Sequence, residues 1–139
     1  MKCIKKSDSY LIKLEKGDRL AETLLNFLGE NKIKFSKFDA IGAVTEAELA
    51  FYSLKDKQYH RKTFKGEFEV TGLIGNSSMH EGRPIIHAHA TIADEKFHAF
   101  GGHVMEMVAA GTLEVFLKVL PFEVERKYDA ETGLKLLDI

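Results

Sequence analysis

Hydrophobic and polar residues alternate with a period of two along most of the chain. This pattern predicts β-strands, because successive side chains of a strand point to opposite faces. We expect strands over residues 10–14, 38–44, 48–54, 59–65, 68–74, 84–93, 97–100, 113–120, 122–128 and 134–137. Turn chemistry separates several of them, notably at residues 75–78, 80–84 and 94–96.

One segment has helical spacing instead. Leu20, Leu24, Phe27 and Leu28 recur as one apolar stripe that ends at Gly29. Gly17 and Asp18 precede the stripe, and we expect the aspartate to be its N-cap. With one or two helices on a mostly antiparallel sheet, the chain is predicted to be an α+β protein. No repeat or linker divides it, so we expect a single domain over residues 1–139.

Composition limits the classes of protein that remain. The 139 residues are 45% hydrophobic and 29% charged, which is typical of a globular domain with a substantial core. No apolar run approaches the roughly 20 residues that a membrane-spanning helix needs. The first residues do not resemble a secretory signal, and Cys3 is the single cysteine. We therefore expect a reducing, cytoplasmic location.

Charge is unevenly distributed along the chain. Residues 1–65 carry a balance of +5 and residues 66–139 a balance of −6, for a net charge of −1. The densest basic cluster is interleaved with aromatic residues, a composition that suits contact with nucleic acid. The solvated face of a β-hairpin explains the pattern equally simply, and we favour it. The cluster consists of Lys55, Lys57, Arg61, Lys62 and Lys65.

The strand predicted over residues 84–93 is the most informative segment. One face is apolar, whereas His87 and His89 lie together on the other. Imidazole is a common ligand of transition metals, and His103, after Gly101 and Gly102, is the best candidate for a third ligand. Three histidines with an open fourth position are typical of a catalytic or labile zinc site. Alternatively, the histidines are half-buried, hydrogen-bonded groups at a subunit interface.

Three further residues are candidates for supporting roles. His98 lies just before Gly101 and is a candidate neighbour of the metal ligands. Glu106 lies among methionine and valine residues, where it would either orient an imidazole or form a salt bridge. Glu69 or Glu106 would be the general base if the site were catalytic. Motifs for a nucleophilic serine, a P-loop or a dinucleotide site are absent from the sequence.

Several short motifs in a fixed order resemble the PPC domain, which is conserved in plants and prokaryotes. The resemblance runs over about residues 17–137 and includes Ile41-Gly42-Ala43, Gly66 to Val70, Gly75-Asn76, Pro84 to His89, Gly101-Gly102-His103 and Tyr128 to Leu134. It implies a compact α+β domain that forms homotrimers. It also implies that His87, His89 and His103 hold a metal, commonly zinc.

The resemblance also bears on DNA binding. In plants the domain follows AT-hooks that bind DNA, whereas Gly82-Arg83-Pro84 here lacks the flanking basic residues of a hook. The first glycine of the family's β-strand signature is usually followed by arginine, where this chain has Glu67. That exchange alters any charge pairing made there, including one between subunits.

Two functional hypotheses follow. The first is a homotrimeric DNA-binding or regulatory module, with DNA or another protein as its partner. The second is a zinc-dependent enzyme or a small-molecule-binding protein that uses the three histidines, with another divalent transition metal as an alternative to zinc.

Overall fold

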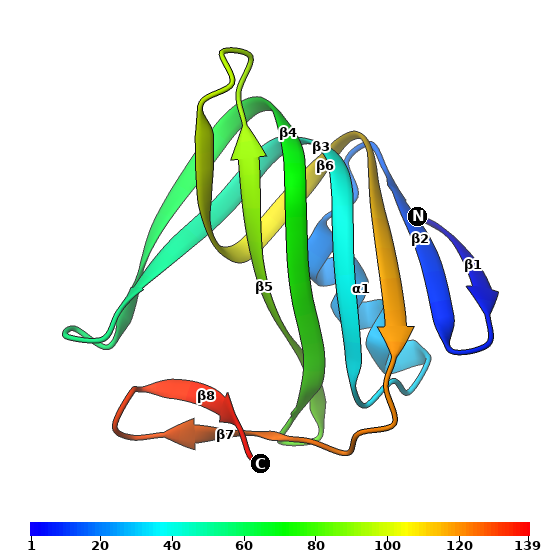
Figure 1. Ribbon diagram of the computed structural model, residues 1–139, viewed down its shortest axis with the longest axis vertical. Coiled ribbons are helices and arrows are strands. Elements are labelled where there is room, and N and C mark those ends of the chain that lie inside the picture. The colour runs from blue at the N-terminus through cyan, green and yellow to red at the C-terminus, as the bar shows by residue number, and fades with distance from the viewer.

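A computed structural model describes all 139 residues and contains one helix and eight strands (Figure 1). This agrees with the predicted α+β class. The elements in chain order are β1 (Lys2–Lys6), β2 (Ser9–Glu15), α1 (Leu20–Glu30), β3 (Ser36–Ser53), β4 (Gln58–His80), β5 (Arg83–Ala93), β6 (Ala99–Val119), β7 (Arg126–Asp129) and β8 (Leu134–Leu137).

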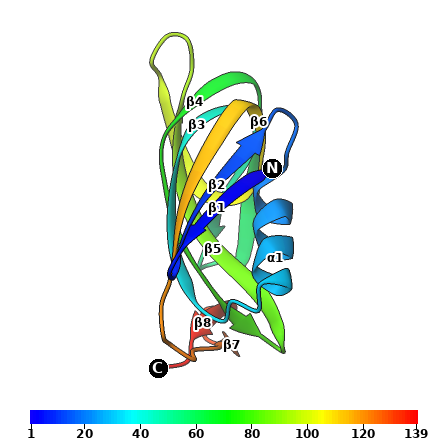
Figure 2. The same ribbon diagram turned by 90° about the vertical axis from the view of Figure 1, so that its right-hand side faces the viewer.

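Six strands form one antiparallel sheet in the order β1-β2-β6-β3-β4-β5. The beginning of β6 also pairs with β5, so the sheet curls round and joins itself there. Strands β7 and β8 form a separate hairpin, which lies below the main sheet in Figure 1. The helix covers one side of the curled sheet (Figure 2).

The long strands differ from the shorter strands expected from the sequence. Strand β4 runs through residues 75–78, where a turn was predicted. That prediction was wrong because Gly75 serves close packing rather than a turn. A Cβ atom there would lie 2.6 Å from the ring of Phe38 and 2.7 Å from the carbonyl oxygen of His87. The expected breaks near residues 45–47 and 66–67 are likewise bends or bulges within continuous strands.

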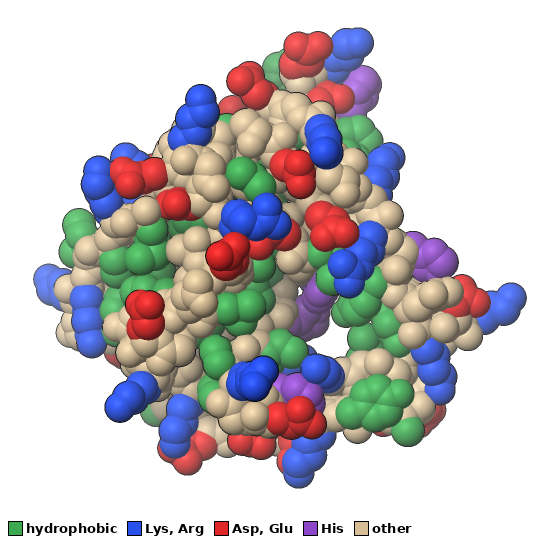
Figure 3. Space-filling view, turned by 180° about the vertical axis from the view of Figure 1, so that it is seen from behind, with side chains coloured by type: hydrophobic (Ala, Val, Ile, Leu, Met, Phe, Trp, Pro, Cys, Tyr) green, Lys and Arg blue, Asp and Glu red, His purple; other side chains and the backbone are tan.

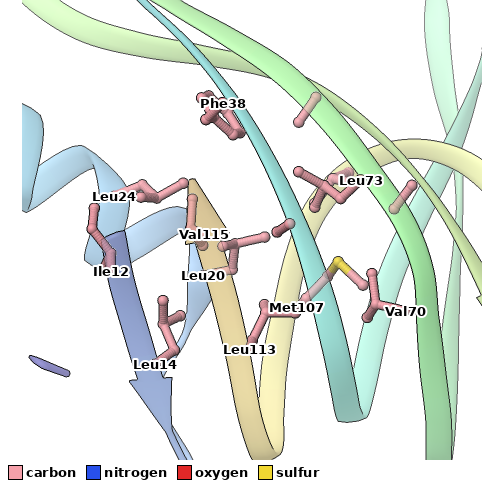
Figure 4. Packing of buried hydrophobic residues seen from close by; sticks show 14 of the residues in the cluster. Ile12, Leu14, Leu20, Leu24, Phe38, Val70, Leu73, Met107, Leu113 and Val115 are labelled. Carbon is pink, nitrogen blue, oxygen red and sulfur yellow. The ribbon is translucent and has the colours of Figure 1, made fainter. Parts of the chain in front are cut away.

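The hydrophobic core lies between the helix and the concave side of the sheet (Figure 4). The predicted helical stripe is confirmed, since Leu20, Leu24, Phe27 and Leu28 are all buried. Leu20 and Leu24 belong to the same cluster as alternate residues of β2 and β6, such as Ile12 and Val115. The single helix has 11 residues and falls short of what a membrane crossing requires.

The start of the helix is capped by a distant residue. Arg19 occupies the N-cap position and makes no side-chain cap, so the predicted cap at Asp18 was wrong. The Asp18 carboxylate accepts a hydrogen bond from the backbone N–H of Glu15 and pairs with the amino terminus instead. Glu106 of β6 supplies the missing acceptor, because its Oε1 atom lies 2.8 Å from the backbone nitrogen of Ala21. A carboxylate at this end also complements the helix dipole.

We therefore expect Glu106→Ala to destabilise the protein by about 1–2 kcal/mol, because the N–H groups of Ala21 and Met107 lose their acceptor. Urea unfolding would measure this loss. Glu114→Ala is the matched control, since Glu114 is a half-buried carboxylate of the same strand that makes no hydrogen bond or ion pair. Equal stability of the two variants would contradict the capping role.

Candidate metal centre

The pairing of β5 with β6 brings three histidines together. His89 lies directly opposite His103 in the register, and His87 is two residues away on the same face of β5. The reverse face of β5 is apolar as predicted, because Ala88, Ala90 and Ile92 are buried. The strand is thus fixed from behind by the core, while its histidines face away from it.

The two glycines before His103 have the role expected of them. A Cβ atom on Gly102 would lie 2.9 Å from the carbonyl oxygen of Ala50 on β3. On Gly101 it would lie 3.2 Å from the carbonyl oxygen of Ala90 on β5. Any larger residue would push the neighbouring strands away. The Gly-Gly pair therefore permits the close strand approach that places His103 beside His89.

The spacing of the imidazoles suits a metal ion. One nitrogen of each ring can be chosen so that all three lie within 4.8 Å of one another. The Nε2 atoms of His87 and His89 are 3.2 Å apart. Two ligand nitrogens on a tetrahedral zinc ion are separated by about 3.3 Å, given Zn–N bonds of about 2.0–2.1 Å. The donor set therefore fits a divalent transition metal with small movements of the rings.

Burial keeps two of these rings in the neutral form that a metal requires. Burial is the main cause that lowers the pKa of His103 to about 4, with the neighbouring His87 as the next contribution. The pKa of His87 is also lowered, chiefly by burial and then by the positive charge of Arg126. In the metal-free protein, these histidines therefore remain unprotonated below the usual pH range of an imidazole.

The group nearest to this cluster was not foreseen from the sequence. Arg126 of β7 is only 7% exposed, and one of its terminal nitrogens lies 3.5 Å from Nδ1 of His87. The same nitrogen donates to the side-chain oxygen of Asn76, which lies opposite His87 on β4. The family motif Gly75-Asn76 drew attention to Asn76 in the sequence. No sequence pattern singled out Arg126, which lies far from the histidines along the chain.

Aromatic residues close the other side of the cluster. The ring of Tyr59 lies 4.8 Å from that of His103, and Tyr52 packs edge-on against Tyr59. The hydroxyl group of Tyr52 donates to the carbonyl oxygen of Thr132, and Lys57 donates to that of Ala130. The tip of the β3–β4 hairpin is thus attached to the turn between β7 and β8. In Figure 3 the surface is hollowed beside these hairpins, with a histidine visible inside.

The predicted supporting residues lie elsewhere. His98 is in the turn before β6, where it bonds to the carboxylate of Asp94. Glu106 faces the helix and pairs with Arg19, as the salt-bridge alternative anticipated. Glu69 lies opposite Ala93, further along the sheet than His89, and is exposed. His98 and Glu69 therefore lie away from the imidazoles, whereas Glu106 makes the salt bridge that was one of its two predicted roles.

The basic cluster lies on the β3–β4 hairpin, as the favoured interpretation stated. Two of its members have acidic partners on β3: Arg61 lies 3.6 Å from Glu48, and Lys65 lies 3.7 Å from Glu46. Lys62 lies over the ring of Phe64 instead. The five cations therefore do not form one unbroken positive surface.

Comparisons with known proteins agree with this architecture. A structure of a "putative DNA-binding protein" from Bacteroides thetaiotaomicron has a TM-score of 0.95 at 26% identity, covering 99% of this chain and 96% of that one. A protein with the same description from Ralstonia eutropha JMP134 has a TM-score of 0.92 at 30% identity, with 99% and 95% covered. A "metal-containing protein" from Archaeoglobus fulgidus has a TM-score of 0.87 at 31% identity, with 95% and 94% covered.

A search of the curated proteins found no significant match. The family model for the Plants and Prokaryotes Conserved (PCC) domain matches residues 1–121. This range includes all three histidines, whereas the hairpin of β7 and β8 lies beyond it. The motifs from Ile41 to His103 that resemble this family fall inside the match. The chain therefore belongs to the Plants and Prokaryotes Conserved domain family.

Proposed function

We propose that this protein is a metal-dependent binding module in which His87, His89 and His103 hold one divalent transition metal. The main observation in its support is that three imidazoles from two paired strands lie together, with the Nε2 atoms of His87 and His89 3.2 Å apart. A relative with 31% identity is named a metal-containing protein, which supports the proposal. Zinc is the ion we favour, because three neutral imidazoles suit its tetrahedral coordination and leave one position open.

Binding is favoured over catalysis by the surroundings of the cluster. Neither of the two glutamates considered as a general base lies beside the imidazoles: Glu106 bonds to the start of the helix, and Glu69 lies further along the sheet. The neighbours of the imidazoles are a cationic guanidinium group and an aromatic ring. Such surroundings are better suited to holding an anion or a flat apolar group than to removing a proton.

Metal analysis of protein purified without an affinity tag tests the proposal. We expect about one zinc ion per chain, and loss of most of it in His87→Ala and in His103→Ala. His98→Ala is the control, because that imidazole is bound to Asp94 away from the cluster. Zinc that is far below one equivalent, or that persists in His87→Ala, would argue against the site.

We also propose that the module assembles as a homotrimer, as the family resemblance implies. A row of exposed apolar side chains on the outer face of the sheet supports self-association. It runs through directly paired residues from β1 to β4 and then reaches His89. Its apolar members are Ile4 at 69% exposure, Leu11 at 39%, Phe116 at 45% and Ile74 at 66%, and the exposed Asp39 lies between the last two. Exposed apolar side chains gathered in this way are typical of an interaction surface.

Light scattering after size exclusion measures the assembly. We expect a mass three times that of the 15.7 kDa chain, and a lower mass for Ile74→Lys. The new lysine would lie opposite Asp39, so it is compatible with the fold while placing a charge in the row. Phe97→Lys is the control, since Phe97 is 90% exposed on a turn outside the row. A wild-type mass equal to one chain would contradict the trimer.

DNA binding is a second candidate function, favoured by the descriptions of two relatives. The cations without an acidic side-chain partner in the basic cluster are Lys55, Lys57 and Lys62, so any binding should be weak and steeply salt-dependent. Three phosphate contacts predict a slope of about −3 for log affinity against log salt. A gel-shift series from low salt upwards measures this slope. Absence of a shifted band at low salt would exclude the DNA function.

A further inference from the structure

Arg126 is a buried cation that is held in one orientation. Its Nε–H donates to the hydroxyl of Ser78 at 3.1 Å, and one terminal nitrogen donates to the carbonyl oxygen of Lys135 at 2.9 Å. The other terminal nitrogen donates to the side-chain oxygen of Asn76 at 2.9 Å and approaches His87. All these partners are neutral. The guanidinium group is therefore positioned by hydrogen bonds, while its charge is left uncompensated.

None of the ion pairs in the molecule includes Arg126. Buried charges in proteins are normally paired, because removing a charge from water without a partner costs several kcal/mol. Burial accordingly lowers the pKa of Arg126. A positively charged group that is buried, oriented and unpaired indicates that an anion from outside the chain belongs beside it.

The guanidinium group lines a cavity of about 300 Å³ that also reaches two of the histidines, His87 and His103. The rest of its wall is mainly apolar and comes from both the curled sheet and the C-terminal hairpin. These remaining lining residues are Tyr59, Ile85, Ile86, Gly133, Leu134, Leu136 and the exposed Lys135. The cavity therefore combines a buried cation and an exposed lysine with an apolar body, at a size typical of a small-molecule site.

We propose that this cavity binds a small organic carboxylate, with its charged end on Arg126 and its apolar body against the isoleucine and leucine side chains. The inference rests on the proposed function in one respect: a metal at His87, His89 and His103 would add positive charge beside the same cavity. Ser78, Lys135 and Asn76 accept from three of the five N–H groups of Arg126, and the remaining ones can donate to a carboxylate. Apolar walls favour a carboxylate with a hydrocarbon chain over inorganic phosphate, which has no apolar part to bury.

Calorimetric titration of the tag-free 139-residue protein with isovalerate tests the proposal. Isovaleramide is the matched probe, since it has nearly the same shape without the charge, and inorganic phosphate has the charge without the hydrocarbon. We expect isovalerate to bind at least tenfold more tightly than either. Equal binding of isovalerate and isovaleramide, tighter binding of phosphate, or no binding of isovalerate would each overturn the proposal.

Substitution of Arg126 tests whether the ligand binds beside this residue. Arg126→Lys keeps the positive charge but loses the planar fork, and we expect it to weaken isovalerate binding about tenfold. Arg83→Lys is the control, because Arg83 is exposed at the start of β5. Unchanged affinity in a folded Arg126→Lys protein would contradict the assignment. If that variant does not fold, the comparison of the three probes on the wild-type protein still decides.

Titrating both the zinc-loaded and the chelator-treated protein separates this inference from the proposed function. Isovalerate binding to a protein that takes up no zinc would support the carboxylate site and reject the metal site. Zinc uptake at the histidines without any isovalerate binding would support the metal site and reject the carboxylate site.

Discussion

The pairing of β5 with β6 is the contact on which the fold and the site both depend. It joins the last strand of the sheet order, β5, to the beginning of β6 and aligns His89 with His103. Gly101 allows this close approach, because a Cβ atom there would lie 3.2 Å from the carbonyl oxygen of Ala90 on β5, while Gly102 allows β6 to approach β3. The same contact keeps Ala90 and Ile92 in the core, so the face opposite the histidines contributes to the stability of the whole molecule. A substitution that opened this contact would therefore affect folding and the site together.

Electrostatics gives the site its chemical character. Burial maintains two neutral imidazoles next to a cationic guanidinium group, and no carboxylate approaches them. Neutral donors leave a bound metal ion with its full charge, which Arg126 reinforces rather than offsets. A metal ion bound there would therefore favour an anionic ligand. This combination accounts for our preference for ligand binding over hydrolysis.

The sequence was informative where local spacing determines structure. Alternation identified the two faces of β5, and the helical stripe identified α1, because both depend on residues close together in the chain. Continuous strands were read as separate ones, because a glycine that allows close packing, such as Gly75, looks the same in a sequence as a glycine in a turn. Arg126 was missed because its place beside His87 depends on how the C-terminal hairpin packs against β4. The sequence left Glu106 with two possible partners, an imidazole or a cation, since the partner of a side chain across a bent sheet depends on bulges.

The two parts of the site come from different segments of the chain. The three histidines and the glycines that unite them lie within the range matched by the family model, whereas Arg126, Leu134 and Leu136 come from the hairpin beyond it. That hairpin is attached through the contact of Tyr52 with Thr132, and Gly133 leaves room for it, since a Cβ atom there would lie 2.8 Å from the Tyr52 hydroxyl oxygen. On our proposal the paired strands β5 and β6 hold the metal, and the C-terminal hairpin supplies the cation and part of the apolar wall that bind the ligand. Binding specificity can then change through the hairpin alone, because the metal ligands are held by a different set of contacts.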